Sequence, residues 1–197
     1  MKVLLINSVC GIRSTGRICT DIAGVLTQAG DECRIGYGRV EAPEDYRQIA
    51  VPIGGKWDIM LHGLGSRLFD NTGVYSGAST CRFLKWVDEY KPDLVHLHNI
   101  HGYYLNIELL FNYLKEKSLP VVWTLHDCWA FTGHCSHFAS AGCKKWKTQC
   151  ESCDLCRFVC VTYKERICQI IQQCDELAQY RRYRKFHYGA GYGITFK

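Results

Sequence analysis

Short runs of aliphatic and β-branched residues alternate along the first 125 residues with longer stretches in which apolar positions recur at helical spacing. The apolar runs at 2–7, 33–37, 93–98 and 121–125 predict buried strands, and 48–52 predicts a weaker one. The predicted helices cover 18–29, 56–70, 80–90 and a segment around 107–114. The positions predicted to face the core are Ile18, Ile22, Val25, Leu26 and Ala29 in the first helix, Phe83, Leu84 and Val87 in the third, and Ile107, Leu110, Phe111 and Leu114 in the last. This alternation predicts an α/β protein with a Rossmann-like, doubly wound and mostly parallel sheet.

Composition and charge divide the chain into two parts. With 197 residues, 47% of them hydrophobic, the chain can bury one α/β core, and it contains no apolar run of 18 residues that would predict a membrane span. The short apolar N-terminus is typical of a first core strand and not of a signal peptide, which predicts a cytoplasmic protein. Residues 157–197 hold 8 of the 24 basic residues but 3 of the 19 acidic ones, which accounts for the net charge of +5. We therefore expect a domain over 1–153 and an irregular basic tail over 154–197, either a solvated end or a contact for an anionic partner.

The clearest indication of a metal site comes from the cysteines. The chain contains thirteen of them, and nine lie from Cys128 onward. The spacing of the first four after Cys128 suits a structural zinc knuckle within 128–153, since four thiolates close a tetrahedral site. The predicted ligands are Cys135, Cys143, Cys150 and Cys153. The neighbouring Cys156, Cys160, His134 and His137 leave the ligand set ambiguous, and reduced or redox-paired thiols are the alternative.

The loop 8–16 joins the first strand to the first helix and contains glycines, hydroxyls and arginines. Exposed backbone N–H groups and the positive end of a helix dipole suit a phosphate, although a plain tight turn fits the same pattern. The residues predicted to bind a substrate here are Gly11, Ser14, Thr15, Gly16 and Arg17.

Two later strands end in histidines and polar side chains, where ligands bind in an open parallel sheet. His98, Asn99 and His101 follow the fourth strand and are predicted to hydrogen bond a substrate; His96 and His98 could instead form a metal pair. His126 and Asp127 follow the fifth strand and are the predicted catalytic pair, because an imidazole can act as acid, base or hydrogen-bond donor near neutral pH. The plainer alternative is a packed histidine and a helix-capping aspartate.

Three stretches of the sequence resemble the N-terminal domain of family 4 glycosyltransferases, in particular bacterial enzymes that build capsular, exopolysaccharide or colanic-acid chains. They read KVLLINSVCGIRSTGRICTDIA, PDLVHLHNIHGYYLN and TLHDCWAFTGHCSHFASAGCKKWKTQCESC. The resemblance implies one half of a GT-B fold, with the acceptor on this half and the nucleotide-sugar donor on a second domain. It also implies that the loop around Gly11–Arg17 approaches the donor phosphates and that His126 contacts the transferred sugar or the reacting centre. The chemistry of the family needs no metal, so the resemblance implies that any zinc is structural.

The resemblance implies transfer of a glycosyl group from a nucleotide sugar to a glycan or lipid-linked acceptor in polysaccharide biosynthesis. The donor-binding half does not follow in this sequence, so we expect a truncated or frame-shifted product, or a donor domain on a separate chain, and no full turnover by this chain alone. We also expect a peripheral contact with the cytoplasmic face of the inner membrane. We expect no binding to nucleic acid, because the tail contains no recognisable nucleic-acid module. Two other functions fit the residues: a non-catalytic zinc-binding interaction module, or a thiol redox protein using Cys150, Cys153 and Cys156.

Overall fold

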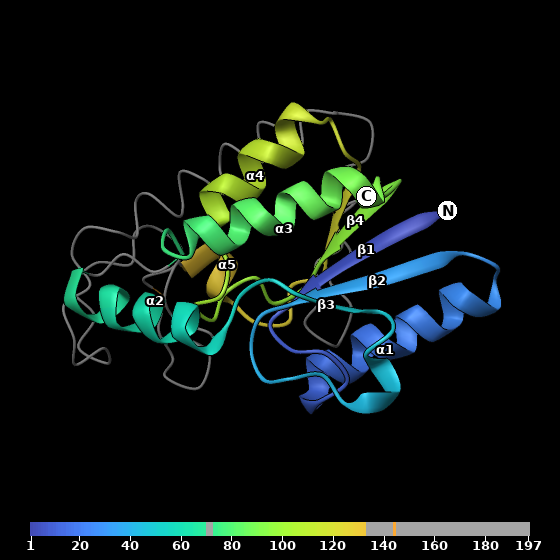
Figure 1. Cartoon of the computed structure of the whole chain (residues 1–197), viewed down its shortest axis with the longest axis horizontal. Coiled ribbons are helices and arrows are strands. Elements are labelled where there is room, and N and C mark those ends of the chain that lie inside the picture. Colours follow the sequence, from blue (N-terminus) through green and yellow to red (C-terminus); the bar gives the residue numbers. More distant parts are fainter. Residues whose placement is uncertain (70–72, 133–143, 145–197) are drawn as a thin grey trace.

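Five parallel strands form one sheet in the order β3-β2-β1-β4-β5 (Figure 1). The computed structural model describes residues 1–69, 73–132 and 144. The strands are β1 (Lys2–Asn7), β2 (Glu32–Tyr37), β3 (Ala50–Pro52), β4 (Leu94–Leu97) and β5 (Val121–Trp123). The helices are α1 (Arg13–Gln28), α2 (Lys56–Phe69), α3 (Gly77–Tyr90), α4 (Ile107–Glu116) and α5 (Trp129–Thr132), with a short 3-10 turn η1 at Glu44–Tyr46. The predicted Rossmann-like parallel sheet is confirmed.

Side chains of the central strand alternate between two apolar clusters, as a strand with both faces buried requires. Val3 and Leu5 pack on the side of α1, whereas Leu4 and Ile6 join the larger cluster formed with α3 and α4. Figure 1 shows α1 on the opposite side of the sheet from α3 and α4. The sheet is therefore a buried middle layer, and its strand ends are the places where polar side chains can meet a ligand.

Helix α1 contacts the sheet through its small residues, which corrects the predicted core face. The buried positions are Gly16, Cys19, Thr20 and Ala23, while Ile18 and Val25 are exposed. Ala29 is also exposed, and Ile22 and Leu26 are partly buried against the core. The reason is steric, since small side chains let the helix axis come close to the sheet and leave the larger ones at the margins.

Several element boundaries differ from the predicted ones. Helix α1 begins at Arg13, so the loop after β1 is shorter than predicted and Thr15 and Gly16 lie in the first helical turns. Helix α3 begins at Gly77, ahead of the predicted residue 80, and β5 ends at Trp123, ahead of Leu125. The backbone N–H of Thr124 still donates to the carbonyl of Leu97, which keeps the end of β5 beside β4.

The direction of chain progression along the sheet reverses between β1 and β4. From β1 the chain adds β2 and β3 on one side, then returns to place β4 and β5 on the other. Such a switch point leaves a crevice at the carboxyl ends of the two strands, which is where doubly wound proteins bind ligands. Within the described ranges, no helix is long and apolar enough to cross a membrane. The four predicted zinc ligands of the cysteine knuckle and the basic tail 154–197 lie outside the described residues.

Candidate functional site

Asn7 joins the two strands of the switch point and is a site residue that the sequence did not single out. It ends β1, is fully buried, and accepts a hydrogen bond on Oδ1 from the backbone N–H of Asn99, 3.1 Å away. Its Nδ2 donates to the carbonyl of Val9 at 2.8 Å and to Oγ1 of Thr15 at 3.3 Å. One amide therefore connects the glycine loop after β1 to the segment after β4. A polar residue closing an otherwise apolar strand was the available signal.

The loop after β1 is tightly built, which explains both of its predicted glycines. Gly11 has a φ of +70°, and a Cβ there would lie 2.5 Å from the ring of Tyr46. A Cβ on the buried Gly16 would lie 3.1 Å from Val9 Cγ2 and 3.2 Å from the backbone N of Gly11. These glycines serve the tight turn, so the turn interpretation is supported by geometry, while phosphate binding stays a prediction. The polar residues Arg13, Ser14 and Arg17 at the start of α1 are exposed.

Two imidazoles from neighbouring strand ends share a hydrogen bond. Nδ1 of His98 and Nε2 of His126 are 2.8 Å apart, and the rings stack with centroids 5.1 Å apart. His98 is 2% exposed, whereas His126 is half-buried. Burial, and then the neighbouring His96 and His126, lower the pKa of His98 to about 3; burial also lowers the pKa of His126, opposed by the charge of Asp127. Both rings are therefore neutral near pH 7.

A third ring lies against this pair. The His96 and His98 centroids are 4.2 Å apart, and Nε2 of His96 lies 2.8 Å from Oγ1 of Thr124. Burial is the main cause of a lowered pKa for His96, with the nearby His126 adding to it. Among the residues that the structure describes, no group of three or more His, Cys, Asp or Glu side chains could hold a metal ion. The predicted zinc ligands Cys135, Cys143, Cys150 and Cys153 lie outside that part, so the knuckle stays a prediction.

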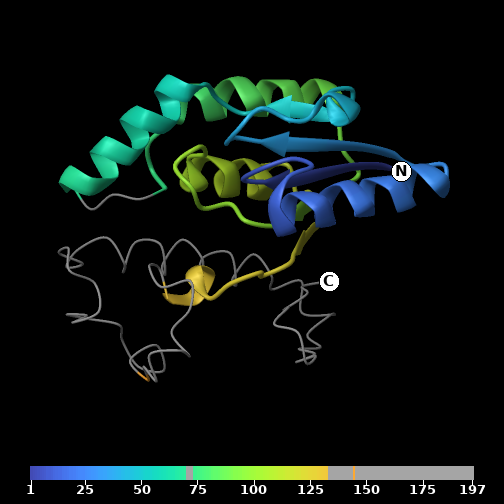
Figure 2. The same ribbon diagram turned by 90° about the horizontal axis from the view of Figure 1, so that it is seen from below.

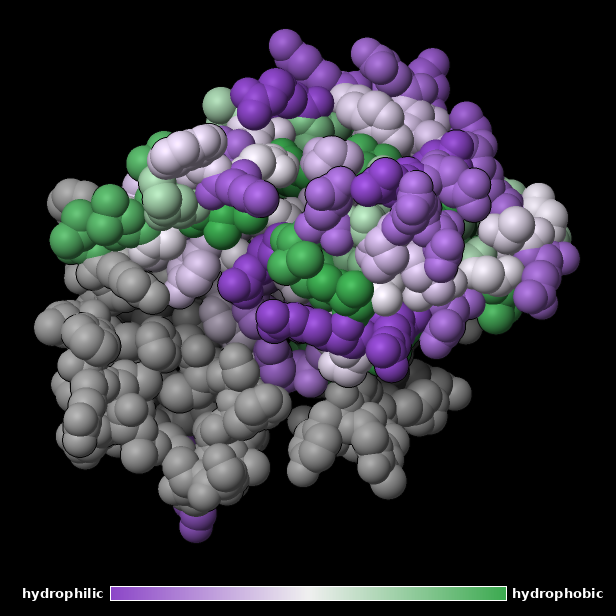
Figure 3. Space-filling model, turned by 60° about the horizontal axis from the view of Figure 1, so that its bottom comes forward, coloured by the Kyte–Doolittle hydropathy of each residue, from purple (hydrophilic) through white to green (hydrophobic). Residues whose placement is uncertain are grey.

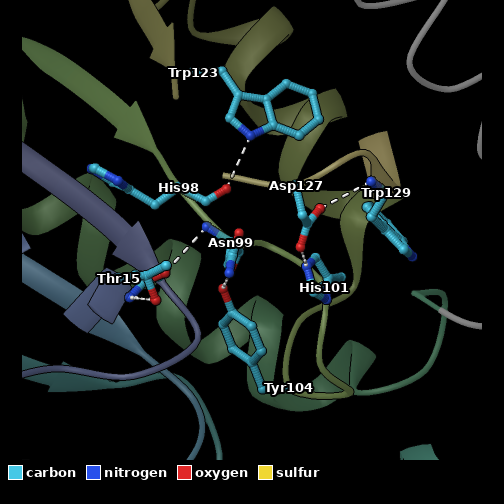
Figure 4. Close-up of polar contacts among 9 residues, drawn as sticks. Thr15, His98, Asn99, His101, Tyr104, Trp123, Asp127 and Trp129 are labelled. Carbon is cyan, nitrogen blue, oxygen red and sulfur yellow. Dashed lines mark hydrogen bonds and ion pairs between the residues drawn. The ribbon is translucent and has the colours of Figure 1, made fainter. Parts of the chain in front are cut away.

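Asp127 links the ends of β4 and β5 through its carboxylate (Figure 4). Oδ2 lies 2.7 Å from Nε2 of His101, and Oδ1 accepts the backbone N–H of Trp129 at 2.9 Å, at the start of α5. The His101 ring also lies against the Trp129 ring, with centroids 5.1 Å apart. The side chains of His101 and Asp127 are 27% and 13% exposed, so this hydrogen-bonded pair can be reached in part from solvent. The capping role that the sequence left open for Asp127 is real, and it coexists with an accessible carboxylate.

Backbone contacts fix the segment that carries these groups. Nε1 of Trp123 donates to the carbonyl of His98 at 3.0 Å, and the hydroxyl of the buried Tyr104 donates to the carbonyl of Asn99 at 2.9 Å. Tyr104 fits because Gly38 has no side chain, since a Cβ there would lie 2.0 Å from its ring. The polar groups are thus held by rigid neighbours, as a preorganised site requires. Neither aromatic residue was singled out from the sequence.

The strand-end residues line a small hollow beyond β4 and β5. It is bordered by His98, Asn99, His101, His126 and Asp127, together with apolar walls from Ile100, Trp123, Leu125, Trp129 and Ala130. The structure brings together all five predicted residues of the two strand ends. The predicted loop residues Gly11, Ser14, Thr15, Gly16 and Arg17 are not in its lining; Thr15 reaches the site through Asn7. The carboxylate and the imidazoles offer hydrogen-bonding groups to a ligand, and the aromatic walls offer apolar surface.

Comparison with known proteins gives a family match that includes this site. The model of the family described as Glycosyltransferase Family 4 matches residues 15–170, which extends beyond the boundary at 153 predicted from the sequence. A putative colanic acid biosynthesis glycosyl transferase, WcaC of Escherichia coli (strain K12), is 36% identical over 67 residues. That stretch is 32% of this chain and 16% of the relative, so the match spans a small part of the relative's length.

Proposed function

Because this chain belongs to glycosyltransferase family 4, we propose that it is the acceptor-side half of an enzyme that transfers a glycosyl group from a nucleotide sugar to a glycan or lipid-linked acceptor. Its Rossmann-like sheet is one half of the GT-B architecture. The name of the E. coli relative refers to colanic acid biosynthesis, which supports polysaccharide biosynthesis as the process. The observation that carries the proposal is the partly exposed His101–Asp127 pair beside His126 in the hollow beyond β4 and β5.

Each polar group has a role that its chemistry suits. The Asp127 carboxylate accepts hydrogen bonds from sugar hydroxyls, and charge-assisted bonds of this kind are about twice as strong as neutral ones. The half-buried His126 contacts the transferred sugar. The start of α1, with exposed Ser14 and Arg17, faces the donor phosphates, because a helix N-terminus attracts anions. The donor itself is held by a second domain, in the same polypeptide or on a separate chain.

Replacement of the carboxylate tests this assignment. Asp127→Asn keeps an oxygen for the Trp129 N–H but loses the charge, so we expect saccharide binding to weaken about tenfold, which corresponds to about 1.4 kcal/mol. The measurement is calorimetric titration with exopolysaccharide fragments, each with and without uridine and guanosine diphosphate sugars. Asp88→Asn is the matched control, because that exposed carboxylate lies on α3 and pairs with Lys117. Absence of saccharide binding by the unaltered chain, or equal binding by Asp127→Asn, would overturn the proposal.

Helix α2 presents a second surface that the proposal uses. Its exposed large hydrophobic residues recur at helical spacing, and they are Trp57, Met60, Leu61, Leu64 and Leu68. We call these five residues the α2 ridge. The same helix buries the polar His62 and Ser66, so its apolar side faces outward. Figure 3 shows hydrophobic surface at the end of the molecule where α2 lies in Figure 1. Contiguous exposed apolar surface of this kind marks an interaction site.

The position and chemistry of the α2 ridge favour a lipid membrane as its partner. Figures 1 and 2 show α2 beyond the carboxyl ends of the strands, which is the end that also carries the candidate site. Trp57 and the exposed Lys56 stand together at the helix start, and tryptophan and lysine are residues that anchor helices at the headgroup level. Insertion of the α2 ridge into the cytoplasmic leaflet of the inner membrane would bring the hollow to a lipid-linked acceptor.

Vesicle sedimentation tests this contact. The triple variant Trp57→Ser, Leu61→Ser and Leu64→Ser should lower binding to vesicles of mixed anionic and zwitterionic lipid at least tenfold, since each buried large apolar side chain contributes about 2 kcal/mol. Val25→Ser together with Val40→Ser is the control, because both side chains are exposed and lie outside α2. Absence of vesicle binding by the unaltered chain would contradict the membrane contact, and a dimer that the triple variant dissociates would assign the α2 ridge to a second copy.

A further inference from the structure

The hydrogen bond between His98 and His126 can be formed in two ways, and the buried surroundings of His98 distinguish them. Either Nδ1–H of His98 donates to Nε2 of His126, or Nε2–H of His126 donates to Nδ1 of His98. In the second case the neutral His98 carries its own proton on Nε2. That atom is buried and has no hydrogen-bond partner among the described residues. The second arrangement therefore buries an unpaired N–H group.

A buried N–H group without a partner is less favourable here than a buried ring nitrogen whose lone pair has no partner. Among buried backbone groups, N–H groups without a partner are rarer than carbonyl oxygens that lack a full set of partners, and we extend this preference to the imidazole nitrogens. The neighbouring His96 ring offers no relief, because it lies 4.2 Å away at an interplanar angle of 34°, and an in-plane N–H of His98 does not point at its face. The first arrangement leaves only a lone pair on Nε2 of His98 and is the stable one.

We infer that His98 is a positioning residue that holds His126 as the Nδ1–H tautomer, so that His126 meets a ligand as a neutral hydrogen-bond donor and not as a general base. With Nε2 of His126 occupied as an acceptor, its proton sits on Nδ1, for which the described residues provide no partner. Protonation of His126 would force the His98 proton onto the buried Nε2, so the pair also resists becoming an imidazolium. The lowered pKa values of both rings agree with this.

The rest of His98 is anchored in a way that suits such a role. Its N–H donates to the carbonyl of Ile6 and its carbonyl accepts from Trp123, so both strands beside it set the position of its ring. At 2% exposure the side chain acts through His126 and not by direct contact with a ligand. The action of His126 on a sugar oxygen rests on the proposed function, whereas the tautomer does not.

Nitrogen NMR of the whole chain labelled with ¹⁵N-histidine tests the inference without any sugar. Long-range ¹H–¹⁵N correlations near neutral pH should show His126 protonated at Nδ1 and unprotonated at Nε2, with the His126→Gln spectrum identifying its signals. His62 is the internal reference, because Nε2 of His62 accepts the N–H of Gly73 and fixes its proton on Nδ1. A His126 found as the Nε2–H tautomer or as an imidazolium would overturn the inference and leave the transferase proposal standing.

Two substitutions of His98 by side chains of similar size, Asn and Leu, separate the effect of its hydrogen-bond donor from the effect of its packing. Asn in place of His98 puts an amide N–H near the position of Nδ1, whereas Leu offers no donor. We expect His98→Leu to convert the His126 signals to a tautomer mixture and His98→Asn to preserve the Nδ1–H form. Saccharide binding should fall about fivefold in His98→Leu, the effect of one ordinary hydrogen bond, and recover in His98→Asn. Unchanged His126 signals in His98→Leu would contradict the positioning role; if the His62 signals show misfolding, the unaltered chain alone decides.

Discussion

At the scale of single residues, the buried side chain of Asn7 should contribute strongly to the free energy of unfolding. Asn7→Leu leaves the N–H of Asn99 and the carbonyl of Val9 without partners in a buried place. Each such orphan costs about 1–3 kcal/mol, so we expect the free energy of unfolding to fall by about 3 kcal/mol. Urea denaturation followed by circular dichroism measures this difference.

The neighbouring Thr15 provides the matched control for Asn7. Thr15→Val keeps the shape and removes only the 3.3 Å bond to Asn7 Nδ2, so it should cost less than about 1 kcal/mol. Equal stability of Asn7→Leu and the unaltered chain would show that the contacts of this amide contribute nothing. The comparison separates the junction between β1 and β4 from the general packing of the loop.

The residues of the site could be predicted from the sequence to different extents, for physical reasons. His98, Asn99, His101, His126 and Asp127 were identified because each follows an apolar strand, and parallel strands end at one edge. Asn7 was missed because its importance depends on β1 lying next to β4, and strand order cannot be read from hydrophobic spacing. The pairing of His98 with His126 depends on the same fact. Partners across strands become visible only with the topology.

At the scale of elements, the small-residue face of α1 should tolerate no increase in volume. Ala23 is 2% exposed between the helix and the sheet, so Ala23→Leu should lower the free energy of unfolding by about 1–3 kcal/mol through overpacking. Val25→Leu on the exposed side of the same helix should change it by less than about 0.5 kcal/mol. Thermal unfolding of the two variants beside the unaltered chain measures both effects, and a harmless Ala23→Leu would show that α1 can move away from the sheet.

Helices α1 and α2 show why apolar spacing located the helices but not their buried sides. A helix is recognised because apolar residues recur, and α2 over 56–69 matches its prediction closely. The side that faces the protein depends on how near the neighbouring layer lies and on what else is available to cover it. In α1 close approach selects Gly16 and Ala23, and in α2 the polar His62 is buried by its bonds to Ser76 and Gly73. Neither reason is contained in the helix's own sequence.

At the scale of the whole molecule, buried histidines should make folding sensitive to mild acid. Burial lowers the pKa of His62 to about 4, and the pKa values of His96, His98 and His126 are also lowered. An unfolded chain binds protons at these side chains near the ordinary value of about 6.5, so between that pH and the folded-state values it holds more protons than the native state. Their contribution is therefore fully present above pH 6.5 and is lost as the pH falls toward the folded-state values.

His62 is the ring on which this pH dependence can be isolated, because it lies away from the candidate site and its Nε2 must stay unprotonated to accept the Gly73 N–H. His62→Gln can keep that acceptor and does not titrate. The variant should therefore lose a pH dependence that grows from near zero above neutral pH to nearly one bound proton at about pH 5. Most carboxylates titrate below this range, which leaves the histidines as the main source of the slope. Urea unfolding at a series of pH values gives both slopes. Identical slopes would mean that the loop at Gly73 opens to protonate His62 without unfolding the domain, and the buried histidines would then report local opening.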